Sequence, residues 1–123
     1  MRLLIVEDNA RMRHLIRSVV ANLAEDVYEC SDGSEALGAY SEHLPDWVLM
    51  DIVLPNLDGI AATKQIKTVF PQAQIVMVTE YDDVKIREAA QTAGVCGYVL
   101  KENLLEVRRI LEAPNRNNDQ EPE

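Results

Sequence analysis

Residues 48–59, VLMDIVLPNLDG, join an apolar segment to an aspartate and then to a stretch rich in turn-forming residues. The apolar run at 48–50 is typical of a strand that is buried on both faces. A buried carboxylate without partners is costly, so Asp51 either opens a turn or is held there for chemistry. The choice depends on whether the rest of the chain brings partners to Asp51.

Similar apolar runs recur along the chain and alternate with helical patterns. We predict strands at 3–7, 27–31, 47–51, 74–79 and 97–101. We predict helices at 10–23, 36–40, 60–69, 83–93 and 104–111, the first capped by Asn9 and the fourth ended by Gly94. Leu15 is placed on the apolar face of the first helix, and Leu105 in the last amphipathic helix. This alternation predicts an α/β fold, a doubly wound parallel sheet with helices on both faces.

Length and composition limit the possible functions. The 123 residues fit one domain, which we place at 1–113; the polar segment 114–123 is expected to be a disordered tail or the start of a linker. The net charge of -9 argues against direct binding to nucleic acid or to anionic membranes. No apolar run approaches the roughly 20 residues that span a bilayer, and no signal peptide is present, so we expect a cytoplasmic protein.

The two cysteines, Cys30 and Cys96, fit no metal-ligand spacing. In a cytoplasmic protein they are expected to be reduced thiols that do not bridge.

Polar side chains follow four of the predicted strands. Glu7 ends the first strand and Asp8 follows it, Asp51 ends the third, Thr79 the fourth and Lys101 the fifth. The carboxyl ends of parallel strands meet at one edge of the sheet, where ligands bind in such folds. Three neighbouring carboxylates repel one another unless a cation relieves them, and oxygen ligands suit Mg²⁺. We therefore predict a magnesium site at this edge.

Four short motifs, taken together and in this order, resemble the receiver domain of the response regulators of two-component signalling. They are VED at 6–8, MDIVLPNLDG at 50–59, VTEYDD at 78–83 and GYVLK at 97–101. The resemblance extends over 2–113. It implies a flavodoxin-like receiver fold with strand order 2-1-3-4-5, in which Cys30 and Cys96 lie toward opposite edges. It also implies a signalling domain rather than an enzyme, one that catalyses only its own phosphorylation and dephosphorylation.

The resemblance also implies roles for the residues at the strand ends. Asp51 would accept a phosphoryl group from a sensor histidine kinase or a phosphotransfer protein. Asp8 and Asp51 would ligate Mg²⁺, Glu7 would act largely through a metal-bound water, and the backbone carbonyl of Val53 would complete the protein ligands. Thr79 and Lys101 would contact phosphoryl oxygens.

The resemblance further implies a conformational switch. Tyr98 would change rotamer together with Thr79 on phosphorylation. The output surface would be the helix 4–strand 5–helix 5 segment, about 83–112, which would bind an output partner or output domain and could form a homodimer on phosphorylation.

Two positions depart from the family pattern. Glu80 replaces the small residue that usually follows the threonine, and Glu102 replaces the proline that often follows the lysine. We interpret Glu80 as a gate that slows small anionic phosphodonors. The GYVLKENLLE stretch is similar to receivers that carry helix-turn-helix output domains, so the chain is a stand-alone switch or the receiver part of a transcription regulator.

Two other classes of protein share parts of this pattern. A pseudo-receiver, an interaction module regulated without phosphorylation, would keep the fold but is expected to lack an acid, the threonine or the lysine. A phosphatase of the haloacid dehalogenase type also uses an Asp nucleophile with Mg²⁺, but it requires an acid where this chain has Val53.

Overall fold

The structure is a computed structural model that describes residues 1–113, so the predicted tail at 114–123 lies outside the described residues. The strands are β1 (Arg2–Val6), β2 (Asp26–Cys30), β3 (Trp47–Met50), β4 (Ile75–Thr79) and β5 (Gly97–Leu100). The α-helices are α1 (Ala10–Val20), α2 (Ala36–His43), α3 (Gly59–Val69), α4 (Val84–Ala93) and α5 (Leu105–Glu112). Short 3₁₀ helices, η1 (Gly33–Glu35) and η2 (Lys101–Asn103), precede α2 and α5.

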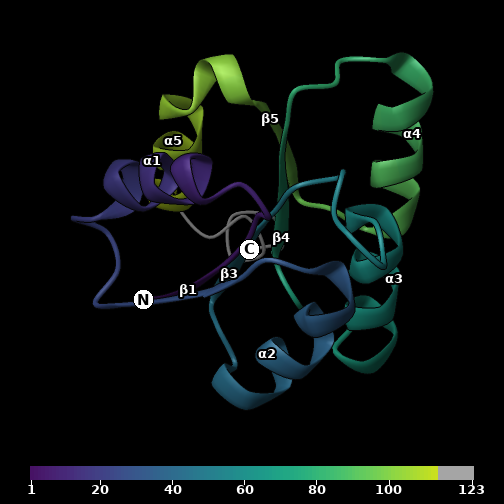
Figure 1. Cartoon of the computed structure of the whole chain (residues 1–123), viewed down its shortest axis with the longest axis horizontal. Coiled ribbons are helices and arrows are strands. Elements are labelled where there is room, and N and C mark those ends of the chain that lie inside the picture. Colours follow the sequence, from purple (N-terminus) through teal and green to yellow (C-terminus); the bar gives the residue numbers. More distant parts are fainter. Residues whose placement is uncertain (114–123) are drawn as a thin grey trace, which may run out of the picture.

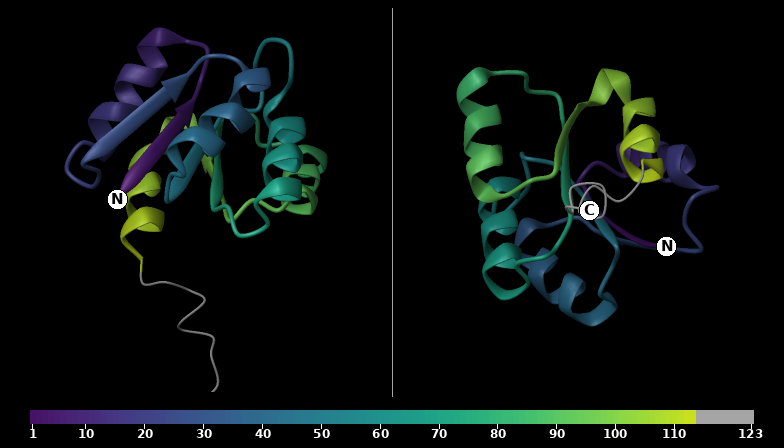
Figure 2. Two further views of the ribbon diagram at one scale, coloured as in Figure 1. Left: turned by 90° about the horizontal axis from the view of Figure 1, so that it is seen from below. Right: turned by 180° about the vertical axis from the view of Figure 1, so that it is seen from behind.

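The five strands form one parallel sheet in the order β2-β1-β3-β4-β5, which confirms the predicted fold (Figures 1 and 2). From β1 the chain adds β2 on one side of the sheet, and from β3 it adds β4 and β5 on the other side. The topological switch point therefore lies between β1 and β3. In open sheets of this kind ligands bind at the carboxyl ends of the strands beside the switch point. The fold thus places the end of β1 next to the end of β3.

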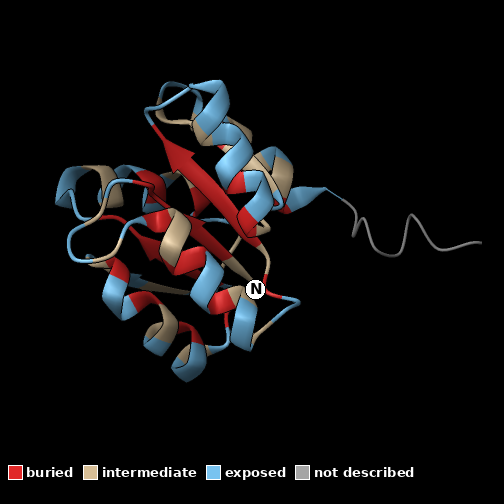
Figure 3. Cartoon of the chain, turned by 90° about the vertical axis from the view of Figure 1, so that its right-hand side faces the viewer, coloured by how far each residue is buried: buried red, intermediate tan, exposed pale blue. Residues whose placement is uncertain are grey.

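Successive strand residues face opposite sides of the sheet and build two apolar cores. Leu4 and Val6 of β1 belong to the core covered by α2, α3 and α4, whereas Leu3 and Ile5 belong to the core covered by α1 and α5 (Figure 1). Every residue of β4 is buried between the two layers of helices (Figure 3). The strands therefore form a rigid base for the loops at their ends.

The helix termini agree with the predicted caps, but two residues predicted on the apolar faces of α1 and α5 are exposed. The Asn9 side chain accepts the Met12 N–H at the start of α1, and Gly94 caps α4 with a left-handed backbone. Leu15 is 46% exposed because it lies about 100° around α1 from the buried Ile16. Leu105, two residues before the buried Val107 and so about 200° around α5, is 70% exposed.

The predicted first helix also extends too far, because α1 ends at Val20. Leu23 lies in the turn that follows, where its N–H donates to the Val20 carbonyl and its side chain packs on the core beneath α1. Because Leu23 follows Val20 by three residues and also packs on the core, its spacing in the sequence is the same as that of one more helical turn.

The segment after β3 is held tightly against the first turn of α3. The Gly59 N–H donates to the Ile52 carbonyl, and a Cβ atom at Gly59 would lie 1.8 Å from the carbonyl oxygen of Asp51. Glycine is therefore required at position 59 because the backbone of Asp51 comes too close for any side chain. A left-handed conformation is not the reason, since the φ of Gly59 is not positive. Its absent side chain lets the backbone of Asp51 rest directly on α3.

Cys30 and Cys96 are both free, as predicted. Cys30 ends β2 and Cys96 directly precedes β5, so they lie near opposite edges of the sheet. Burial raises the pKa of the Cys30 thiol to about 11, which keeps it protonated and unreactive near neutral pH. None of the helices within residues 1–113 combines the length and apolar character needed to cross a membrane.

Candidate phosphorylation and metal site

Three carboxylates meet where β1 and β3 end. Glu7 and Asp8 directly follow β1, Asp51 directly follows β3, and the last residues of the two strands are paired in register. One carboxylate oxygen from each acid lies within 4.8 Å of the others. Glu7 is 1% exposed and Asp51 5%, whereas Asp8 is exposed. Three negative charges in so small a volume require a counter-charge.

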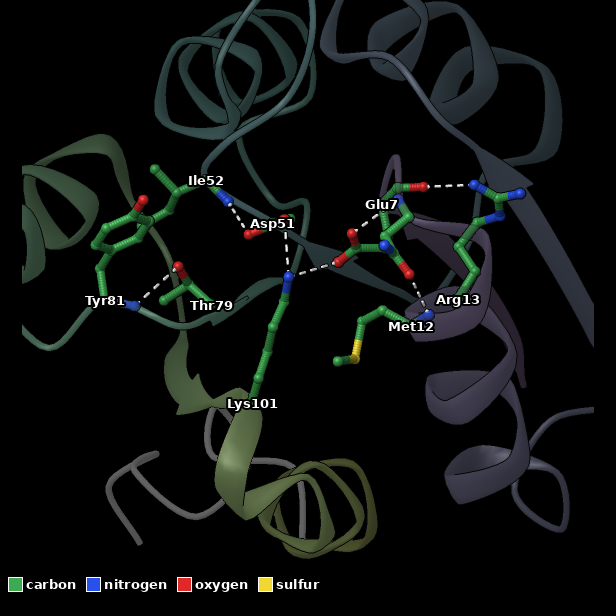
Figure 4. A network of polar contacts seen from close by, with 9 residues as sticks. Glu7, Met12, Arg13, Asp51, Ile52, Thr79, Tyr81 and Lys101 are labelled. Carbon is green, nitrogen blue, oxygen red and sulfur yellow. Dashed lines mark hydrogen bonds and ion pairs between the residues drawn. The ribbon is translucent and has the colours of Figure 1, made fainter.

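Lys101 supplies one positive charge to this cluster. It is the first residue after β5, and its Nζ lies 2.9 Å from Glu7 Oε1 and 3.0 Å from Asp51 Oδ2 (Figure 4). Burial acts to lower the pKa of the ammonium group, but the two carboxylates outweigh it and raise the pKa above its ordinary value. Lys101 therefore stays charged near neutral pH. Its single positive charge faces the three carboxylates of Glu7, Asp8 and Asp51.

The other oxygens of the two buried acids show why a cation would fit. Asp51 Oδ1 accepts the Ile52 N–H at 2.7 Å, and Glu7 Oε2 accepts the Asn9 N–H at 3.0 Å. Glu7 Oε1 is buried, and its partner among the described residues is the Lys101 ammonium group, 2.9 Å away. A hard divalent ion such as Mg²⁺ binds this kind of oxygen donor set. Val53, the other predicted ligand, lies in the loop two residues beyond Asp51, and it is 53% exposed.

The environment of Glu7 leads to a prediction on stability. Burial, reinforced by the charge of Asp51, raises the pKa of Glu7, although Lys101 and the Asn9 N–H oppose the shift. A raised carboxyl pKa means that folding favours the protonated acid. This contribution to stability is complete below the unfolded pKa of about 4.3 and is lost as the pH rises through the folded pKa.

Glu7→Gln should therefore increase the free energy of unfolding at pH 7 in the absence of divalent metal, because it removes a charge whose burial opposes folding. Lys101 keeps Asp51 as a partner in this variant, so no buried charge is left unpaired. Urea denaturation with a chelator measures the difference, which should shrink at pH 4. Glu88→Gln, at an exposed position of α4, is the matched control. A Glu7→Gln protein less stable than the wild type at pH 7 would contradict this electrostatic account.

Thr79 and Tyr98 are linked through the backbone of one residue. The fully buried Thr79 ends β4, and its hydroxyl oxygen accepts the Tyr81 N–H at 3.3 Å (Figure 4). The Tyr98 hydroxyl donates to the Tyr81 carbonyl oxygen at 2.7 Å. The Arg87 guanidinium lies over the Tyr98 ring, 4.4 Å from its centroid, and pairs with Asp82. A displacement of Thr79 would therefore disturb the residue that holds the Tyr98 hydroxyl.

Glu80 and Glu102, the two departures from the family pattern, lie on the same side of Lys101. Together with Leu100 and Lys101 they line a hollow of about 350 Å³. Both glutamates are exposed, and within residues 1–113 neither forms an ion pair. An anion that approaches Lys101 through this hollow passes two uncompensated carboxylates.

Two contacts of the site were not predicted from the sequence. Arg13 of α1 donates to the Glu7 carbonyl oxygen, and Tyr81 connects Thr79 with Tyr98 through its backbone. A basic residue in the first turns of a helix that follows an acidic strand end is a usable signal for Arg13. Tyr81 acts through backbone groups that every residue carries, so its side chain gives no signal.

Comparisons with known proteins agree with this geometry. A family model described as the response regulator receiver domain matches residues 3–113. The chain is 40% identical over 116 residues to the chemotaxis protein CheY of Bacillus subtilis, covering 94% of this chain and 95% of that protein. It is 36% identical over 102 residues to the response regulator protein VraR of Staphylococcus aureus, covering 81% of this chain but 49% of VraR.

Solved structures show the same fold. A two-component response regulator of the LuxR family from Aurantimonas superposes with a TM-score of 0.80 at 31% identity, covering 89% of this chain and 84% of that one. The response regulator domain of Thermotoga maritima CheB gives a TM-score of 0.83 at 24% identity, covering 99% and 98% of the two chains, and shows likeness of fold alone.

Proposed function

The chain belongs to the response regulator receiver domain family, and on that premise we propose that it is a switch phosphorylated on Asp51. The observation that carries the proposal is the position of Asp51, which shares the ammonium group of Lys101 with Glu7 beside a third acid, Asp8. The acid cluster, the threonine and the lysine are all present. A pseudo-receiver is expected to lack at least one of them.

The proposed reaction transfers a phosphoryl group from a phosphohistidine of a sensor kinase or phosphotransfer protein. A carboxylate oxygen of Asp51 attacks phosphorus, the P–N bond breaks, and the imidazole leaves with the electron pair and takes up a proton. Mg²⁺, held by Asp8, Asp51, the Val53 carbonyl and, through water, Glu7, would neutralise charge on the phosphoryl oxygens. Lys101 and the Thr79 hydroxyl would contact the same oxygens from the other side.

The switch would act through the Thr79–Tyr81–Tyr98 connection. If Thr79 turns toward a phosphoryl group, its hydroxyl oxygen no longer accepts the Tyr81 N–H, and the support of the Tyr98 hydroxyl changes. A phosphorylation signal can act only through a surface that differs between the two states. The output surface would be the α4–β5–α5 segment, residues 83–112, with Tyr98 at its centre.

Amide hydrogen exchange tests this output surface. After treatment with acetyl phosphate and Mg²⁺, exchange within residues 83–112 should change, while exchange within β1 and β2 stays the same. Asp51→Asn, treated in the same way, is the control for effects of the donor and the metal. A phosphorylation-dependent change confined to α1 would contradict the proposed switch.

Glu80 would act as a gate at the hollow beside Lys101, and Glu102 would reinforce it. Glu80→Ala should react roughly three- to tenfold faster with acetyl phosphate at low ionic strength, and salt should narrow the gap. Glu80→Gln separates charge from size, because it removes the charge and keeps the bulk. Phosphoramidate, which carries less negative charge than acetyl phosphate, should gain less from either substitution. Equal rates for wild type and both variants at low salt would refute the gate.

The partners follow from the same proposal. They are a histidine kinase or phosphotransfer protein as donor, and an output partner or output domain that binds residues 83–112, with homodimer formation on phosphorylation as one form of output. Relatives of the chain include a protein of similar length and a response regulator about twice as long. We propose that this chain is either a stand-alone switch or the receiver part of a transcription regulator. We place the receiver domain at 1–113 and the protein in the cytoplasm, without direct contact to nucleic acid or membrane.

A further inference from the structure

Arg13 ties the acidic end of β1 to the neighbouring strand β2. Its Nη1 donates to the carbonyl oxygen of Glu7 at 2.8 Å (Figure 4), and its Nε donates to Oε1 of Glu29 at 3.0 Å. The Arg13 side chain is 22% exposed. Glu29 lies in β2, opposite Ile5 of β1, and its second carboxylate oxygen accepts from Arg17, one turn farther along α1.

The contact fixes one particular peptide group. The Glu7 carbonyl belongs to the planar peptide that joins Glu7 to Asp8, so holding this oxygen also restrains the backbone N and Cα atoms of Asp8. The other groups of Glu7 are held as well, because its N–H donates to the Cys30 carbonyl and Oε2 accepts the Asn9 N–H. Arg13 thus supplies the hydrogen bond to the carbonyl oxygen of the Glu7–Asp8 peptide, next to a residue that is already held on both sides.

Asp8 depends on this support more than the other acids of the cluster do. Glu7 and Asp51 are buried and contact Lys101, whereas the exposed Asp8 side chain makes no hydrogen bond or ion pair with any residue in 1–113. The backbone therefore sets where the Cα and Cβ atoms of Asp8 lie, and the carboxylate can rotate from there toward a cation. A cation ligand that is held in place before binding loses less conformational freedom when the cation binds.

We propose that Arg13, oriented by Glu29, is a positioning residue that sets the Glu7–Asp8 peptide for cation binding. The proposal rests on the proposed metal site but concerns a residue that touches neither the cation nor the phosphoryl group. Loss of a residue that orients a metal ligand without touching the metal typically weakens metal binding by about 10- to 100-fold.

The two possible effects of Arg13, its positive charge and its hydrogen bond to Glu7, predict opposite changes in Mg²⁺ affinity when Arg13 is replaced. If Arg13 acted only as a nearby positive charge, Arg13→Met would remove a repulsion and tighten Mg²⁺ binding. If Arg13 positions the peptide, Arg13→Met should weaken Mg²⁺ binding about tenfold. Arg17→Met is the matched control, since Arg17 pairs with the same Glu29 and carries the same charge but makes no hydrogen bond to Glu7.

Isothermal titration of Mg²⁺ into wild type, Arg13→Met and Arg17→Met measures the affinities, and melting curves confirm that the variants fold. If Arg13→Met does not fold, Arg13→Lys takes its place, since it keeps the charge without the guanidinium fork and should also bind Mg²⁺ more weakly than the wild type. Amide exchange without metal gives a second readout: Asn9 should exchange faster in Arg13→Met and unchanged in Arg17→Met. Equal or tighter Mg²⁺ binding by Arg13→Met would overturn the role of Arg13, whereas a wild type that binds no Mg²⁺ would count against the metal site itself.

Discussion

Asp8→Asn should lower the affinity for Mg²⁺ by roughly 10- to 100-fold. Asp8 is the exposed member of the acid cluster and has no partner within residues 1–113, so asparagine can replace it without breaking a contact. The substitution keeps the shape of the side chain and one oxygen but removes a negative charge. Hard divalent cations depend on such charge for much of their affinity.

A calorimetric titration of Mg²⁺ measures this effect directly, and the fluorescence of Trp47, in β3, offers a second signal. Asp26→Asn is the control. Asp26 is an exposed acid at the amino end of β2, away from the acid cluster at the carboxyl ends of the strands, and its substitution changes the net charge of the chain by the same amount. The control should bind Mg²⁺ like the wild type. If Asp8→Asn also bound with wild-type affinity, the metal assignment would be wrong.

The sheet and the gathering of the acids could be predicted because both follow from simple periodicities. Apolar runs such as those at 3–6 and 75–78 are too short for buried helices and too uniform for exposed strands, and helical patterns separate them. Parallel strands joined by helices place their carboxyl ends at one edge, so Glu7 and Asp51 had to be neighbours once β1 and β3 were central. The order of the strands came from the resemblance to receiver domains.

Other features depend on three-dimensional contacts that leave little trace in the sequence. Leu15 and Leu105 looked like core residues by spacing, but the helices present Ile16 and Val107 to the sheet instead. Gly59 stands in the stretch rich in turn-forming residues, and in the structure it lets the backbone of Asp51 rest on α3. The partners of the Tyr81 backbone likewise depend on how the loop after β4 folds over β5.

Asp51→Asn should abolish phosphorylation, the largest effect expected of any single substitution in this chain. Asparagine keeps the size of the side chain and can still accept the Ile52 N–H, but its amide oxygen is not a nucleophile toward phosphorus. The buried surroundings should tolerate the change, because the remaining acids, Glu7 and Asp8, still balance Lys101. A melting temperature and circular dichroism spectrum close to those of the wild type would show that the variant is folded.

The most direct test of a phosphorylatable switch is the mass of the protein after incubation with acetyl phosphate and Mg²⁺. We expect the wild type to gain one phosphoryl group, and reduction of the acyl phosphate with borohydride followed by peptide mapping to place it on Asp51. Asp51→Asn should gain none. A wild type that gains no phosphoryl group from this donor or from a phosphorylated kinase would support the pseudo-receiver alternative, and an adduct on Asp51→Asn would contradict the assignment of Asp51.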